Sequence, residues 1–290
     1  MDKLEKAGKI ASEALFYGKS LVKINANLDD VANKIETKIL ELGGKPAFPV
    51  TICINEIAAH ALSNNNKFKQ GDLVKLDVGV HVDGYIADNA ATIDLGNNNK
   101  LVEASEKALE EAIKLVKIGV EVNKIGKAIE TTIKEYGFNP IKNLSGHQID
   151  LYEEHAKDGI SIPNYDNNDK TKLEKGMVIA IEPFATAGAG LVEEGKDSGI
   201  YEVAQVKNVR SDIAREILSF IIENYNTLPF NKNWLLSKFP EFKVNFAIRM
   251  LEKENIVYQH KQLVEKSKGL VSQAEHTLLV DDEIKIITKR

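Results

Sequence analysis

The stretch GDLVKLDVGVHVDGYIADNAATIDLG, residues 71–96, decides the fold. Between residues 74 and 82 valine or leucine alternates with lysine, aspartate, glycine and histidine. This period of two predicts a strand with one apolar and one polar face. The dipeptide Asp83-Gly84 strongly favours a two-residue hairpin turn. Residues 85–95 are therefore expected to form the second strand of a β-hairpin.

Two acidic residues of this hairpin, Asp77 and Asp88, are expected to lie close together. A two-residue turn places Asp88 opposite Gly79, so the two carboxylates become diagonal neighbours on one face, with Cβ atoms roughly 7 Å apart or less. A β-bulge would break this register. Carboxylates this close repel each other unless they are protonated or share a cation. The hairpin therefore predicts a site for one divalent cation or a pair of them.

Composition excludes several classes of protein. The chain has 290 residues, of which 43% are hydrophobic and 28% charged, with a formal net charge of -5. This is ordinary globular composition, sufficient for one large domain or two smaller ones. No run of about 18 apolar residues predicts a membrane span, and the charged N-terminal segment does not resemble a secretory signal. The mild acidity argues against a nucleic-acid partner.

Cysteine usage points to a reducing compartment. The chain has one cysteine, Cys53, which excludes an internal disulfide framework. We interpret it as a small core residue rather than a nucleophile, because no histidine signature accompanies it. A cytoplasmic location is expected on this basis.

Helical and strand-like segments alternate twice along the chain. Helices are expected at residues 3–19, 28–42, 100–117 and 122–136. Strands are expected at residues 51–55, in the hairpin, near His147, and at 177–182, 201–209 and 275–280. The order of two helices followed by antiparallel strands therefore occurs twice. It predicts an α+β fold built from a duplicated unit, with helices on one face of the sheet and the other face left for a site.

Residues 211–272 differ from the rest. Ser211 can cap a helix, further short helices are expected at 230–239 and 241–254, and the basic stretch 257–269 suggests a two-stranded wing. One interpretation is a helical insertion that packs on its parent domain. The other is a winged-helix-like module, a fold that would not by itself imply DNA binding. We predict one domain from residues 1–210 and 273–290, interrupted by a helical insertion at 211–272.

Further candidate ligands lie outside the hairpin. His147 and His155 are eight positions apart, which puts both on one face if the stretch is extended. A lone histidine is more often structural, but two of the six histidines fall within ten residues here, which favours function. His60 is another histidine in an apolar segment, NEIAAH.

Glutamates end or begin two of the apolar strands. Glu182 lies on the face of Val178 and Ala180, and Glu275 repeats this arrangement near the C-terminus. A carboxylate that points where apolar residues point is ion-paired, has a raised pKa or binds a metal. Four carboxylates and an imidazole suit manganese, iron or cobalt better than a structural zinc site. Two such ions about 3.5–4 Å apart can share bridging carboxylates and a bridging hydroxide.

Seven separated motifs carry a resemblance to a known family. They are AFPV at 47–50, INEIAAH at 54–60, KLDVG at 75–79, GYIAD at 84–88, LSGH at 144–147, IAIEPFAT at 179–186 and QAEHT at 273–277. Through them the chain resembles the type 2 methionine aminopeptidases, which have the pita-bread fold shared with prolidase and creatinase. The helical insertion before Glu275 is similar to type 2, since type 1 lacks it. The chain shows no long charged N-terminal extension and so resembles the archaeal form.

The resemblance implies a dinuclear metal centre for cobalt, manganese, iron or zinc. The five implied ligands are Asp77, Asp88, His147, Glu182 and Glu275. Asp88 and Glu275 would bridge both ions, Asp77 would complete one, and His147 and Glu182 the other.

The resemblance also implies the residues that hold substrate. His60 and His155 match two substrate-binding histidines, and Phe48 matches a wall of the methionine pocket. His260 or Tyr258 would line the mouth of the same pocket. After the first histidine the family often continues with Tyr-Thr-Pro, whereas this chain has ALSN at 61–64, which leaves the shape of the pocket rim open.

The implied activity is removal of the N-terminal methionine from newly made proteins, with a small second residue preferred. A bridging hydroxide would be the nucleophile, Glu182 the proton shuttle, and His155 and His60 the contacts to substrate and transition state. The expected partners are nascent polypeptide N-termini at the ribosome, with no DNA and no membrane, and the expected state is a monomer.

Three alternatives remain at this stage. A prolidase or aminopeptidase P would carry a separate N-terminal domain, whereas the hairpin arrives here by residue 72. A non-catalytic pita-bread protein that binds peptides, histones or RNA typically loses metal ligands, and this chain keeps all five. A two-metal phosphoesterase would want a basic cluster near the site, and the sequence shows none.

Overall fold

The computed structural model describes residues 2–289. Its first half is built around the predicted hairpin, β4 (Leu73–Val82) and β5 (Tyr85–Asp94). The turn residues Asp83 and Gly84 both have positive φ, 50° and 87°, as a type I′ hairpin requires. Gly79 lies opposite Asp88 and Asp77 opposite Ala90, with no register shift along the ladder. The register predicted from the turn is therefore confirmed.

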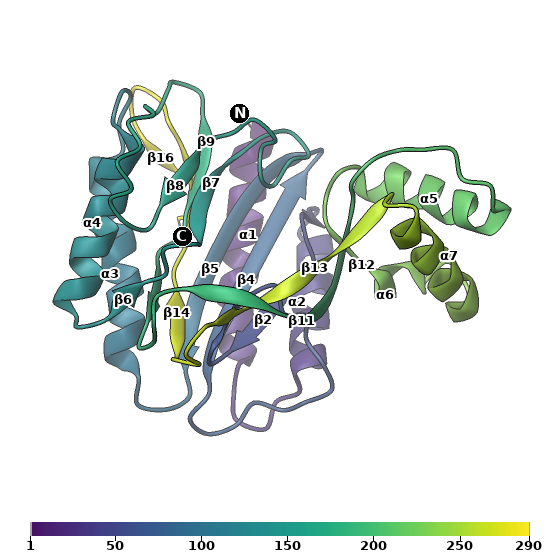
Figure 1. Ribbon diagram of the computed structural model, residues 1–290, viewed down its shortest axis with the longest axis horizontal. Helices are drawn as coiled ribbons and strands as arrows, with labels where there is room; N and C mark the ends of the chain where they lie inside the picture. Colours follow the sequence, from purple (N-terminus) through teal and green to yellow (C-terminus); the bar gives the residue numbers. More distant parts are fainter. Residues whose placement is uncertain (1, 290) are drawn as a thin grey trace.

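Helices cover one face of this sheet. α1 (Asp2–Leu21) packs on β4 and β5, and α2 (Leu28–Glu41) packs on α1 (Figure 1). Asn27 caps α2 by accepting a hydrogen bond from the Asp30 amide. Strands β1 (Lys45–Pro46) and β2 (Thr51–Ile54) pair with β4. Apolar side chains of both helices and of β4 form the first hydrophobic core.

The second half repeats this arrangement. Helices α3 (Asn99–Leu115) and α4 (Val122–Glu135) pack on each other beside a five-stranded sheet in the order β16-β15-β9-β7-β8. These strands are β7 (Ser145–Ile149), β8 (Ser161–Pro163), β9 (Val178–Ile181), β15 (His276–Leu279) and β16 (Lys285–Ile286). A second core joins the helices to β9 and β15. The predicted α+β class, with antiparallel sheets covered by helices, is confirmed.

Three further short strands form a small sheet in the order β14-β10-β6. They are β6 (Asn139–Pro140), β10 (Phe184–Thr186) and β14 (Val271–Gln273). β10 follows Glu182 closely and β14 precedes Glu275. Glu182 therefore lies between β9 of the larger sheet and β10 of this small sheet, and Glu275 lies between β14 of the small sheet and β15 of the larger one.

Residues 211–256, called here the helical unit, project from one side of the body (Figure 1). They contain α5 (Asp212–Tyr225), β12 (Phe230–Asn231), α6 (Lys232–Leu235) and α7 (Glu241–Lys253) around a core of their own. Ser211 caps α5 as expected, accepting from the Ala214 amide. The single helix expected at 230–239 is wrong, because β12 takes its first residues and α6 lasts only four residues. The domain boundaries at 211 and 272 stay predictions.

Two long strands connect the helical unit to the body. β11 (Val192–Val203) pairs with β13 (Val257–Glu265), and β13 also pairs with β3 (Ile57–Ala59). The two-stranded wing expected at 257–269 is therefore wrong, since residues 257–265 form the single strand β13 of this sheet. The strand expected at 201–209 is also misplaced, because β11 begins at residue 192. The polar run EEGKDS at residues 193–198 of β11 lacks the alternation of apolar and polar residues that predicts a strand, since most of these side chains are exposed.

No helix within residues 2–289 is long and apolar enough to span a membrane.

Candidate metal centre

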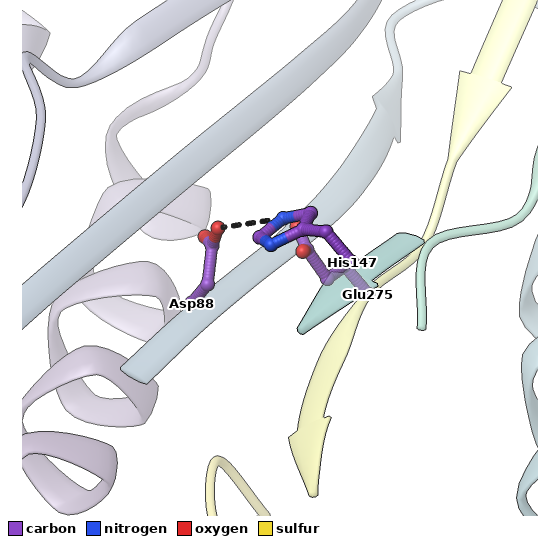
Figure 2. A group of neighbouring side chains, drawn as sticks. All are labelled: Asp88, His147 and Glu275. Atoms are coloured by element: carbon purple, nitrogen blue, oxygen red, sulfur yellow. Dashed lines mark ion pairs between the residues drawn. The ribbon is translucent and has the colours of Figure 1, made fainter. Parts of the chain in front are cut away.

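The five predicted ligands meet on the face of the sheet opposite α1. Asp77 and Asp88 come from the central hairpin and His147 from β7, while Glu182 directly follows β9 and Glu275 directly precedes β15. Because Ile181 pairs with His276, these two glutamates lie opposite each other where their strands end. Asp88, His147 and Glu275 are nearly fully buried and point toward one another (Figure 2).

Distances within this group suit a shared cation. One donor atom from each of Asp88, His147 and Glu275 lies within 4.8 Å of the others. His147 Nε2 is 3.9 Å from Asp88 Oδ2 and 3.6 Å from Glu182 Oε1. Two donors on one ion, each about 2.1 Å from it, lie at most about 4.2 Å apart. Both measured separations fall within that reach.

The group is also rich in buried polar atoms without a protein hydrogen-bond partner. They are Asp77 Oδ1, Asp88 Oδ1, His147 Nδ1 and both carboxylate oxygens of Glu275. Leaving a buried acceptor unpaired costs about 1–3 kcal/mol, and more for a charged group. Cations that prefer carboxylate and imidazole ligands would satisfy the oxygens and offset the repulsion between them.

The pKa shifts of these side chains have the same cause, which is burial of charged groups beside one another. Burial, followed by the charges of neighbouring carboxylates, raises the pKa of Asp77 to about 7 and raises the pKa values of Asp88, Glu182 and Glu275 well above their ordinary values. Burial and then the nearby His155 lower the pKa of His147 well below its ordinary value. The contact between His147 and Asp88 is an ion pair only when His147 is protonated, and the lowered pKa of His147 disfavours that form. A bound divalent ion would reverse these shifts on the carboxyls.

Gln273 holds two of the carboxylates, and Thr277 holds the backbone of Asp88. Gln273 Nε2 donates to Asp77 Oδ2 at 3.3 Å and to Glu182 Oε2 at 3.4 Å, which joins ligands from opposite halves of the molecule. The Thr277 hydroxyl accepts from the Asp88 amide at 2.7 Å and donates to its carbonyl at 2.8 Å. Such partners hold metal ligands in their binding geometry.

His155 lies against the predicted ligand His147. The two rings stack with centroids 3.8 Å apart and an interplanar angle of 15°. Glu154 Oε1 lies 3.6 Å from His155 Nε2. Loss of solvation would lower the pKa of His155, but the hydrogen bond and charge of Glu154 outweigh it and raise that pKa above its ordinary value. The structure thus brings His155 to the site as a donor beside the ligands.

His60 lies outside the group of five predicted ligands and faces β13. It adopts φ of 59°, and its Nδ1 lies 3.1 Å from the Lys261 carbonyl, to which it donates. Its ring meets the His260 ring edge-on at 5.2 Å. Burial and then His260 lower the pKa of His60, which favours the neutral ring, whose Nε2 can accept a hydrogen bond while Nδ1 donates to Lys261. Glu202 in turn accepts from Tyr258 at 2.7 Å and lies 3.2 Å from His260 Nε2.

Phe48 borders the carboxylates. A Cβ placed on Gly79 would lie 2.1 Å from Phe48 Cε1, so the ring occupies the space above this glycine. Gly79 is the cross-strand partner of Asp88 and is two residues from Asp77. The apolar ring therefore lies directly beside the two acidic residues.

Sequence reasoning did not single out Gln273, Thr277 or Glu154 as site residues. The first two belong to the QAEHT motif, whose even spacing around Glu275 was an available signal. No signal marked Glu154, because its role depends on the loop after β7 folding back toward the site.

Comparison with known proteins agrees with this geometry. The family model of metallopeptidase family M24 matches residues 2–231. The methionine aminopeptidase of Pyrococcus abyssi is 47% identical over 293 residues, covering 99% of both chains. That of Archaeoglobus fulgidus is 48% identical over 292 residues, covering 100% of this chain and 98% of the other. The structure of a thermophilic Arx1 superposes with a TM-score of 0.83 at 18% identity, covering 99% of this chain and 90% of that one, a likeness in fold alone.

The pita-bread fold and the buried Asp/His/Glu group define a metallopeptidase, and the chain belongs to metallopeptidase family M24. The full-length identity to the archaeal proteins places it, within that family, among the methionine aminopeptidases.

Proposed function

We propose that this chain removes the N-terminal methionine of newly made proteins by hydrolysis at two divalent metal ions. The observation that carries the proposal is the convergence of four carboxylates and an imidazole. Asp88, His147 and Glu275 are buried, and all of the five except Glu182 have buried side-chain atoms without a protein hydrogen-bond partner. Asp77, Asp88, His147, Glu182 and Glu275 would hold the ions, and Asp88 and Glu275 would serve both of them.

The donor set fits such ions. Four carboxylates and one imidazole suit manganese, iron or cobalt, and zinc is also compatible. When bound, divalent ions lower the pKa of a water toward neutrality and polarise the substrate carbonyl. The remaining tasks of binding, orientation and proton transfer belong to side chains of this chain.

Three side chains carry these tasks in our proposal. Glu182 accepts a proton from the attacking water and passes it to the leaving amine, since its carboxylate lies among the proposed ligands, 3.6 Å from His147 Nε2. His155, whose pKa is raised by Glu154, donates a hydrogen bond to the oxyanion of the tetrahedral intermediate. His60 contacts the scissile amide with the ring nitrogen that is not bound to Lys261.

The substrate in this proposal is a peptide that begins with methionine. Its side chain lies against Phe48, and a small second residue is favoured because the chain must turn at a narrow mouth lined by His60 and by His260 or Tyr258. The physiological source is the N-terminus of a nascent polypeptide in the cytoplasm.

Release of free methionine tests the proposal. Apo protein is titrated with manganese, cobalt, iron or zinc and supplied with Met-Ala-Ser, with Leu-Ala-Ser and Ala-Pro-Ser as controls. Metal-dependent release from the methionine peptide alone supports it. Cleavage of Ala-Pro-Ser instead would assign a proline-specific activity, and silence with every metal in folded protein would favour a peptide-binding role.

A further inference from the structure

Lys75 is a lysine buried completely inside the molecule. It lies in β4 with 0% of its surface exposed, and lysine is almost never fully buried unless it is paired. Its Nζ donates to two backbone carbonyls, that of Asn55 at 2.6 Å and, at the longer distance of 3.5 Å, that of Leu73. Burial lowers the pKa of Lys75 to about 7, and its nitrogen carries N–H donors whether or not it is charged. Burying such a group costs free energy, which the hydrogen bond to Asn55 offsets.

The Asn55 carbonyl is a junction between three strands. Besides Lys75 Nζ from β4, it accepts from the Val271 amide at the start of β14, at 3.1 Å. Asn55 directly follows β2 and has a φ of 56°. Its amide donates to the Leu73 carbonyl at 2.9 Å, and its Oδ1 accepts from the Leu73 amide at 2.9 Å. The junction therefore joins β2, β4 and β14, and Lys75 supplies it with a side-chain donor.

Each strand of this junction leads to a residue of the proposed site. On β4, Asp77 lies two residues beyond Lys75 and on the same face. From the end of β2 the chain runs through β3 to His60. On β14, Gln273 is the last residue, and its side chain joins Asp77 to Glu182. A shift of the junction would therefore change the positions of these side chains relative to one another.

A second attachment holds the other end of β14. Thr92 of β5 is the cross-strand partner of Lys75. Its hydroxyl donates to the Gln273 carbonyl at 2.7 Å and accepts from the Gln273 amide at 2.8 Å. β14 is thus fixed to the hairpin at both ends, by Thr92 at Gln273 and by Lys75, through the Asn55 carbonyl, at Val271.

We propose that Lys75 is a positioning residue for the metal centre and for His60. Through the Asn55 carbonyl it holds the start of β14, and so keeps the Gln273 amide in place beside Asp77. It also fixes the start of the segment that carries His60. The inference rests on the proposed function, because it names a further residue that acts on that same site.

Manganese binding and kinetics of the full-length variant Lys75→Met test the proposal. Methionine has an unbranched side chain of similar length and cannot donate the hydrogen bond. By calorimetry, we expect manganese to bind the apo variant about tenfold more weakly, in the range that loss of a residue supporting metal ligands gives. KM of the metal-loaded variant for Met-Ala-Ser should rise several-fold, because His60 is displaced.

Ser105→Ala is the matched control. The Ser105 hydroxyl is also buried and donates to a backbone carbonyl, that of Val102 at 3.0 Å, but both residues belong to α3. This variant should keep manganese affinity and KM near wild type.

A double-mutant cycle with Gln273→Leu separates positioning from a general loss of stability. If Lys75 acts on the metal centre through Gln273, the double variant should bind manganese about as weakly as Gln273→Leu alone, because residues of one network give non-additive effects. Separate losses that multiply in the double variant would overturn the proposal. Wild-type manganese affinity and KM in folded Lys75→Met would overturn it as well.

If Lys75→Met does not fold, Lys75→Gln takes its place in the cycle. Its shorter side chain lengthens the contact to the Asn55 carbonyl, so the same effects are expected at smaller size, and wild-type values would overturn the proposal. Failure of the proposed function is distinguishable, because wild-type protein would then release no methionine, whereas calorimetry tests Lys75 without turnover.

Discussion

The ring of Phe48 fills the space that a side chain at Gly79 would need, since a Cβ there would lie 2.1 Å from Phe48 Cε1. Phe48 is 6% exposed and packed in the apolar cluster, so it cannot move without disturbing that cluster. Gly79→Ala is therefore expected to lower kcat/KM for Met-Ala-Ser at least tenfold while metal binding is retained.

The double variant Gly79→Ala with Phe48→Leu tests the cause. A smaller residue at 48 should recover part of the lost activity, because it restores room above the strand. Full activity in Gly79→Ala alone would contradict the placement of the ring beside the substrate.

The pH dependence of stability should differ between apo and metal-loaded protein. Burial raises the folded-state pKa of Asp77 to about 7, whereas an unfolded aspartate titrates near 3.9. The folded apo state thus binds more protons than the unfolded state between about pH 4 and 7, so its stability falls as pH rises through this window. Bound cations replace those protons, and metal should raise Tm most at the upper end.

Thermal unfolding with and without manganese checks this sign. Asp77→Asn removes the titrating group and is expected to flatten the apo profile relative to wild type. An apo protein that gains stability from pH 5 to 7 more steeply than Asp77→Asn would contradict the raised pKa.

Removing a shared carboxylate should abolish turnover. Asp88→Asn and Glu275→Gln keep side-chain volume but weaken a ligand proposed to serve both ions, so we expect more than a hundredfold loss of kcat and fewer than two bound ions per chain. Elemental analysis alongside the peptide assay measures both. Wild-type turnover in either variant at saturating metal would refute the bridging assignment.

Gln273 offers a test outside the ligand set. It joins Asp77 and Glu182 through one amide, and loss of such a partner typically costs 10–100-fold in metal affinity or activity. Gln273→Leu should therefore need about tenfold or more metal for half-maximal activity. Gln273→Glu would add a fifth carboxyl and is expected to behave differently, with tighter binding at high pH.

His155 is expected to affect chemistry more than metal binding. His155→Ala removes the donor proposed for the oxyanion, a change that costs about 10²–10³ in kcat in comparable sites. Metal content should remain near wild type, although the ring stacks on His147. Equal loss of metal and turnover would make His155 a ligand or its essential support.

The hairpin and the helix pairs were predictable because they depend on local patterns. Alternation of valine and leucine with polar residues, together with Asp83-Gly84, defined β4, β5 and their register, and so the approach of Asp77 to Asp88. β11 was misplaced, because its exposed polar run hides the period of two. The helix expected at 230–239 was also wrong, since β12 takes residues 230–231 and α6 spans only Lys232–Leu235.

The sequence by itself determined which residue types were available for a metal centre and, at the hairpin, where two of them lie. Turn chemistry and strand period act over a few residues, so they can be read without the fold. Only the tertiary structure decided that Gln273 joins Asp77 to Glu182, that His155 stacks on His147, and that Leu228 packs in the apolar cluster around Phe48. These contacts join segments distant in the chain, and their geometry depends on how sheets and loops pack, for which a single sequence carries no local signal.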